Sequence, residues 1–127
     1  MKPSRIKFFT EATGEVFAEL TGKNPKTAEK ILRALPLEGT ACRWGEEVYF
    51  ETPVEAEEEE AVQDVEVGDV AYWPPGRAIC IFFGRTPVSR GEKPRAYSPV
   101  NVFARVVGNP KLFSKVREGD RILVFRA

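Results

Sequence analysis

GDVAYWPPGRAICIFFGRTP, residues 68–87, has the highest density of aromatic rings in the chain. Two apolar runs flank Pro74-Pro75-Gly76, and a corner of this kind between apolar runs is typical of two consecutive strands. Both faces of the second run are apolar, so its pattern alone does not show which of Phe82 and Phe83 points inward. We predict a mainly β fold built around these two strands.

The composition is that of a single globular domain. The chain has 127 residues, of which 43% are hydrophobic and 30% are charged, and we predict one domain over residues 1–127. The first residues, MKPSRIKFF, lack the apolar core of a signal peptide, and no apolar run approaches the roughly 18 residues of a membrane span. We therefore predict a cytoplasmic protein without a membrane partner. Asn and Gln are scarce beside abundant Glu, Lys and Arg, which suggests a thermophilic source.

The residue types restrict the chemistry. The chain contains no histidine, which excludes Ser-His and Cys-His nucleophile systems and removes the commonest metal ligand. Its two cysteines, Cys42 and Cys80, fit neither a CxxC motif nor a disulfide framework, so we expect two reduced residues. We predict no metal site and no cofactor.

Charge is segregated along the chain although the formal net charge is zero. Residues 44–76 hold eleven acidic residues and neither Lys nor Arg, whereas residues 77–127 hold eleven basic residues and three acidic ones. If the two segments interleave in one sheet, many of these charges pair across strands. The chain lacks the basic excess that phosphate binding needs, so we predict no nucleic-acid partner.

Residues 25–35 have helical periodicity. Asn24 is expected to cap this helix, Pro25 occupies its first position and Pro36 stops it. A single apolar stripe follows the helical spacing. We predict one helix over about 25–35 that covers an end of the sheet.

The rest of the chain alternates between strand patterns and turns. The expected strands lie at residues 5–10, 15–20, 40–44, 46–51, 70–73, 78–83, 101–107 and 121–125, with a short helical turn near 110–115. About eight strands and one helix favour a closed or nearly closed antiparallel β-barrel.

The connections also have recognisable patterns. The acidic run at 55–60 is expected to be exposed and mobile, because its charges repel one another. Residues 84–100 contain three prolines and four cationic side chains, and a loop of this length is usually functional or mobile. The spacing Val-x-x-Gly-Asp precedes a hydrophobic strand at 65–69 and again at 116–120, which predicts two similar turns.

Three separated stretches together resemble the cyclophilins. GEVFAEL at 14–20, followed by PKTAEK at 25–30, is similar to the opening strand and helix start of that family. GDVAY at 68–72, leading to Phe82 and Phe83, is similar to its groove strands, and VFARVV at 102–107 to a late strand. The chain looks most like the small prokaryotic cyclophilin-like proteins, whose function is generally unassigned. The resemblance implies a cyclophilin-like barrel, with Phe83 lining its groove and Phe82 in the core.

The resemblance does not extend to most of the family's catalytic residues. Cyclophilin enzymes are prolyl isomerases whose groove uses an Arg, a Phe, a Gln and a late His. Only Arg43 corresponds, in ACRW at 41–44, and the late His does not exist. If the protein is an isomerase, Arg43 is the catalytic candidate. The missing residues argue against efficient isomerase activity.

We therefore expect a binding module in which an aromatic and arginine-bearing groove holds a small molecule or an extended peptide. The predicted binding residues are Arg43, Tyr49, Phe50, Tyr72, Trp73, Arg77 and Phe83. Two alternatives stay open. One is a weak prolyl isomerase, or another enzyme that pairs Arg43 with Glu46, Glu47 or Glu51. The other is a regulatory or assembly subunit, for which a homo-oligomer is one form.

Overall fold

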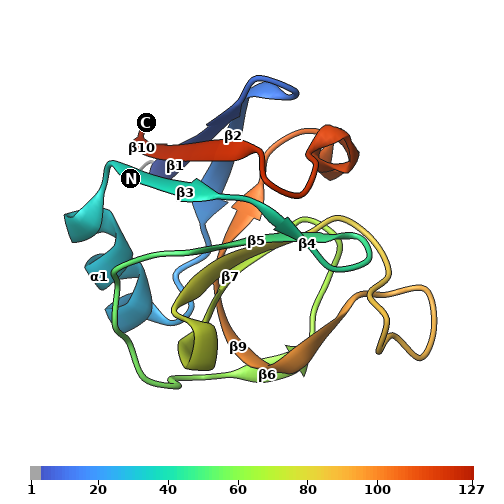
Figure 1. Ribbon diagram of the computed structural model, residues 1–127. Coiled ribbons are helices and arrows are strands. Elements are labelled where there is room, and N and C mark those ends of the chain that lie inside the picture. Colours follow the sequence, from blue (N-terminus) through green and yellow to red (C-terminus); the bar gives the residue numbers. More distant parts are fainter. Residues whose placement is uncertain (1–3) are drawn as a thin grey trace.

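The computed structural model describes residues 4–127, which form ten β-strands, one α-helix and two 3-10 helices (Figure 1). In chain order they are β1 (Arg5–Thr10), β2 (Gly14–Leu20), α1 (Pro25–Ala34), β3 (Leu37–Thr40), β4 (Cys42–Arg43), β5 (Glu47–Glu51), β6 (Val62–Asp64), β7 (Asp69–Trp73), η1 (Pro74–Gly76), β8 (Ala78–Phe82), β9 (Arg95–Val106), η2 (Pro110–Lys115) and β10 (Arg121–Arg126). The predicted helix and the predicted helical turn near 110–115 are confirmed by α1 and η2. Within the described part of the chain, no helix is long and apolar enough to cross a membrane.

The strands form one antiparallel sheet. Its order is β3-β10-β1-β2-β9-β7-β8-β5-β4, and β6 pairs separately with β9. The mainly β, antiparallel prediction is confirmed. The predicted count of about eight strands and the closure into a barrel are wrong, because the described residues form ten strands and the ladder between the two edges stays open.

The two edges of the sheet are consecutive pieces of one chain segment. β3 pairs with β10 and β4 pairs with β5, while Ala41 between them donates its N–H to the carbonyl of Asp120. The edges nevertheless lie close together, since a Cβ placed on Gly39 of β3 would stand 2.9 Å from Cδ2 of Phe50 on β5. The sheet is thus strongly curved, and side-chain packing rather than a hydrogen-bond ladder spans the opening.

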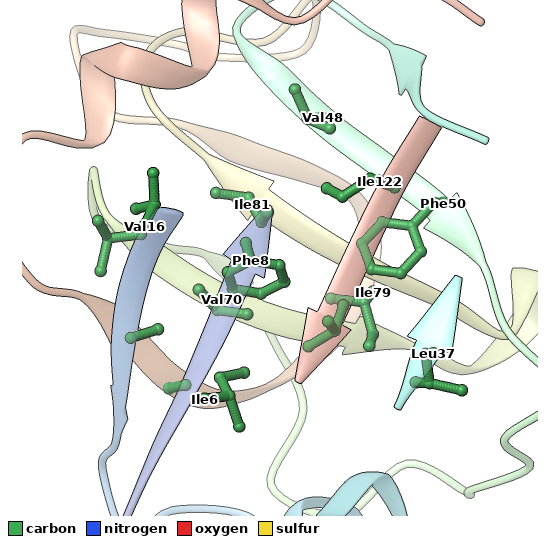
Figure 2. Packing of buried hydrophobic residues seen from close by; sticks show 14 of the residues in the cluster. Ile6, Phe8, Val16, Leu37, Val48, Phe50, Val70, Ile79, Ile81 and Ile122 are labelled. Atoms are coloured by element: carbon green, nitrogen blue, oxygen red, sulfur yellow. The ribbon is translucent and has the colours of Figure 1, made fainter. Parts of the chain in front are cut away.

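The main core fills the inside of this curved sheet (Figure 2). Phe8, Phe50, Val70, Ile79 and Ile81 come from four different strands and are completely buried. Each such side chain contributes about 1.5–3 kcal/mol through removal of apolar surface from water. The side chains inside the curved sheet therefore stabilise the fold.

Two helical segments close the ends of the main core. α1 contributes Ala28 and Ile31 to it. At the other end of the molecule (Figure 1), η2 contributes Phe113, whose ring meets that of Phe8 edge to face at a centroid distance of 6.0 Å. The stripe of apolar residues predicted for the helix is the face that packs on the sheet.

The start of α1 is capped differently from the prediction. The side chain of Asn24 donates to the carbonyl of Val102 and accepts from the N–H of Glu60, both at 2.7 Å. The carboxylate of Glu59 instead accepts the N–H of Thr27 at 3.1 Å, a favourable place for a negative charge. The acidic run expected to be mobile is exposed, but these hydrogen bonds hold it against α1.

The two Val-x-x-Gly-Asp segments form the same turn, as predicted. Gly68 and Gly119 have φ angles of 97° and 93°, in the region that favours glycine. Asp69 and Asp120 each accept a hydrogen bond from the backbone N–H three residues earlier, at 2.9 and 2.8 Å. One short sequence pattern therefore directs the chain into β7 and into β10.

A second layer covers part of the outside of the sheet. The long connection predicted at 84–100 ends at Arg95, where β9 begins. The first half of β9 pairs with β6, which places Val62 opposite Val100 and Asp64 opposite Arg95. Ala96 and Val100 are thereby buried against the outer face of β7 and β8, and this burial is why strand structure extends into a segment that has loop composition.

Pairing between the segregated charges is also observed, in two cases across neighbouring strands. Five ion pairs join residues 44–76 to residues 77–127. They are Arg77–Glu55, Lys93–Glu66, Arg95–Asp64, Arg105–Asp69 and Lys111–Glu46. The acidic and basic halves of the chain are therefore complementary within one molecule.

Candidate functional site: an aromatic cavity with a buried carboxylate

The strands β5, β7 and β8 have two different faces because side chains alternate along each strand. The register pairs Tyr49 with Cys80, and Cys80 with Ala71. Glu47 and Trp73 lie two residues from these positions on their own strands, so they share the same outer face. This outer face carries Glu47 together with Tyr49 and Trp73, whereas the inner face of the same strands belongs to the main core.

An aromatic cavity of about 190 Å³ opens on this outer face. Its walls are mostly apolar, and they come from β5, β7, β8, β9 and the turn before β5. The residues that line the aromatic cavity are Trp44, Glu47, Tyr49, Trp73, Cys80, Ala96, Tyr97 and Val100.

Three rings stand nearly at right angles around the aromatic cavity. The ring of Tyr97 meets that of Trp44 at a centroid distance of 5.9 Å and an interplanar angle of 77°. It meets the ring of Trp73 at 6.1 Å and 85°. The indole N–H of Trp73 donates to Oγ of Ser98 at 2.7 Å, which fixes this ring. Tyr97 is 68% exposed, so it forms a wall of the aromatic cavity that borders solvent.

Glu47 supplies the one carboxylate among the residues that line the aromatic cavity. Its side chain is 5% exposed, and no ion pair among residues 4–127 includes it. Burial raises its pKa from 4.5 to about 7, while a hydrogen bond with the thiol of Cys80 lowers it slightly. A carboxyl group with this pKa changes its charge near neutral pH.

The titratable neighbours of Glu47 are neutral around it. Burial, followed by the charge of Glu47, raises the pKa of Cys80 well above its usual value. Burial also raises the pKa of the phenol of Tyr49. The aromatic cavity can therefore offer one acid–base group, several ring faces and no fixed positive charge.

A second depression adjoins the aromatic cavity and shares Tyr49 and Trp73 with it. This depression of about 510 Å³ is bordered further by Cys42, Glu51 and Ala78, among others. A ligand seated in the aromatic cavity therefore has room for a substituent that passes over Tyr49. Among the described residues, no group of three or more His, Cys, Asp or Glu side chains is placed to hold a metal ion.

Of the predicted binding residues, only Tyr49 and Trp73 line the aromatic cavity. Arg43 lies on the inner side, with its guanidinium 5.0 Å from the centroid of the Phe83 ring. It donates to the backbone carbonyls of Val116, at 2.8 Å, and Gly45, at 3.1 Å. Its hydrogen bonds thus join the β4–β5 turn to the segment before β10, and its side chain is not part of the aromatic cavity.

The remaining predicted binding residues lie elsewhere. Phe50, Tyr72 and Phe83 are completely buried in the main core, and Phe82 belongs to the cluster beneath the aromatic cavity. This is the reverse of the expected orientation of Phe82 and Phe83. The reason is the register: Phe82 pairs with Glu47 and so shares its outer face. Arg77 is exposed and pairs with Glu55 at 3.0 Å.

Sequence reasoning missed Trp44 and Tyr97 as binding residues and treated Glu47 only as a candidate acid on a hairpin. A signal for Glu47 exists in residues 78–83, AICIFF, which are apolar on both faces. A strand with two apolar faces must be covered on both sides. A layer that covers this strand, β8, on both sides also reaches β5, which pairs with it. A charged residue on the outer face of β5 is then buried.

The fold and this site can now be compared with known proteins. Residues 4–125 match the family model described as Cyclophilin-like, so the chain belongs to the cyclophilin-like family. It is similar to the solution structure of the hypothetical protein AF2241 from Archaeoglobus fulgidus, with 43% sequence identity and a TM-score of 0.82. That match covers 98% of this chain and 95% of the archaeal one. No curated protein matches the chain.

Proposed function

We propose that the protein binds a small molecule in the aromatic cavity. The observation that carries this proposal is a carboxylate buried at the edge of a ring-walled, mostly apolar cavity that lies outside the main core. Ligand sites combine apolar walls with a few placed polar groups in this way. An acid buried without a cationic partner costs stability, and a ligand site is a place where such a cost serves a function.

The size of the aromatic cavity favours a small molecule over an extended peptide. About 190 Å³ accommodates a fragment or a head group, and the adjoining depression extends the site along Tyr49 and Trp73. A prolyl isomerase has less support, because Arg43, its one catalytic candidate, is engaged with backbone carbonyls. The aromatic cavity has no Arg or Lys among its lining residues.

The chain offers its own reporters for a test. Trp44 and Trp73 are its only two tryptophans, and both line the aromatic cavity. A fragment library is screened by following the two indole N–H signals in nitrogen–proton NMR spectra. We expect several aromatic or aliphatic fragments to shift both signals in a saturable way.

A cavity-filling variant provides the control for this screen. Ala96→Leu places bulk inside the aromatic cavity and should abolish the shifts, whereas Ala12→Leu makes the same change at an exposed turn and should not. Circular dichroism checks that both variants are folded. Fragments that bind while leaving both indole signals unmoved, or a library with no binder at all, would contradict the proposal.

A further inference from the structure

The charges around the aromatic cavity are unbalanced. Glu47 is buried, and neither Lys nor Arg lines the cavity. Buried carboxylates in folded proteins are nearly always paired. Asp69 follows this rule in the same sheet, since its carboxylate lies 3.0 Å from the guanidinium of Arg105. The residues that line the aromatic cavity supply no positive charge to pair with Glu47, and a cationic ligand would supply one.

The surrounding rings suit a positive charge of a particular kind. Tyr97 stands nearly perpendicular to both Trp44 and Trp73, with interplanar angles of 77° and 85°. Rings at right angles form the corner of a box, whose faces carry the negative part of the ring quadrupole. Such boxes hold alkylated ammonium groups, because the ring faces attract the charge while the alkyl groups need apolar surroundings. Ala96 and Val100 supply apolar surface beside the rings.

We propose that the ligand is a small organic cation, whose alkylated ammonium group occupies the space between Trp44, Trp73 and Tyr97 and faces the carboxylate of Glu47. This inference rests on the proposed function and specifies its ligand class. The carboxylate neutralises the cation, and the rings exclude the water that would otherwise weaken the attraction. A substituent on the ammonium group extends over Tyr49 into the adjoining depression.

The test compares two molecules of the same shape that differ in charge. Choline is the cationic probe, and 3,3-dimethylbutan-1-ol replaces its nitrogen by carbon and is neutral. Each is titrated at pH 8 into the wild type, Glu47→Gln and Glu92→Gln, with tryptophan fluorescence and the two indole N–H signals as readouts. Glu92 is exposed and borders neither the aromatic cavity nor the adjoining depression, so its variant is the matched control.

Choline should bind the wild type roughly tenfold or more tightly than the neutral alcohol, since the charge adds both a ring–cation attraction and a coulombic attraction to the carboxylate. Glu47→Gln should lose most of this difference, whereas Glu92→Gln should keep it. If Glu47→Gln fails to fold, the comparison of the two probes on the wild type still decides.

The failures of the two proposals are distinguishable. Equal binding of both probes, or binding of neutral fragments but not of choline, would overturn the cation inference and leave the aromatic cavity as a binding site. An absence of binding by both probes and by the whole fragment library would overturn the proposed function and the inference together.

Discussion

The two faces of β5, β7 and β8 differ in what they bury. The inner face presents Phe50, Val70 and Ile79 to the main core, and each is completely buried among apolar neighbours. On the outer face Glu47 is buried, while Tyr97, in the second layer that covers this face, is largely exposed. One sheet therefore separates the stabilising main core from the proposed binding site, because alternation along a strand sends successive residues to opposite sides.

The second layer of the fold, called the covering layer below, explains why the outer face is not packed like the main core. It consists of β6, the first half of β9 and residues that pack beside them, and it covers the sheet without filling the space above Glu47 and Cys80. A residue on the inner face is constrained from every side by packing. An exposed wall of the aromatic cavity, such as Tyr97, has neighbours on one side only, so its substitution should affect binding more than folding.

The largest effect on stability is expected at Phe50, on the inner face. Phe50→Ala removes a completely buried ring and should lower the free energy of unfolding by about 3–5 kcal/mol. Urea denaturation measures the loss. In the fraction that stays folded, the indole N–H signals of Trp44 and Trp73 should keep their positions. A loss below about 1 kcal/mol would show that the inner face is not the stabilising one.

The sequence predicted the strands and the helix better than the face on which each strand residue lies, for a physical reason. The hairpin at 5–20 and the helix at 25–35 follow from local patterns, namely alternation, a helical stripe and a proline at each end. Tyr49 and Trp73 were found because they lie in aromatic runs. Phe50 and Tyr72 came from the same runs but face the main core, because composition does not determine the side of a strand on which a residue lies.

The other site residues depend on contacts between distant segments. Glu47 is buried because the layer that contains Tyr97 covers the sheet, and this layer is held partly by β6, which has only three residues. Neither β6 nor the first half of β9 has a clear strand pattern. Both segments are strands because they pair with each other. Local periodicity cannot predict such a layer, so the aromatic cavity was not foreseen.

The next largest effect is a dependence of stability on pH at Glu47. Its pKa is about 7 in the folded chain and about 4.5 in the unfolded chain, so the folded state binds more protons between these values. Stability therefore falls as pH rises from 4.5 to 7 and is constant above that range. The raised pKa corresponds to about 3 kcal/mol. Without ligand, Glu47→Gln should gain about this much relative to the wild type between pH 4 and pH 8.

The difference between wild type and variant isolates Glu47, because all other carboxylates titrate in both. Urea denaturation at several pH values provides the measurement. The titratable groups that interact with Glu47 are the thiol of Cys80 and the phenol of Tyr49, and both are present in both proteins. Glu51→Gln is the control and should show no such change. A wild-type minus Glu47→Gln difference that is flat with pH would mean that the carboxylate is better solvated than its burial indicates.

The smallest effect on stability, and the sharpest separation of the two faces, is expected at Tyr97. Tyr97 is 68% exposed, so Tyr97→Ala should lower the free energy of unfolding by about 1 kcal/mol, the lower end of what two edge-to-face contacts provide, because exposure weakens both contacts. The same change removes one wall of the aromatic cavity and should weaken binding of choline several-fold, because the cation loses a ring face and gains water. Tyr97→Phe keeps the ring and should bind as the wild type does.

Thermal unfolding and tryptophan fluorescence titrations measure stability and choline binding on the same samples. If Tyr97→Ala lost stability in proportion to binding, the covering layer would belong to the fold as much as the inner face does, and the division of tasks between the two faces would fail.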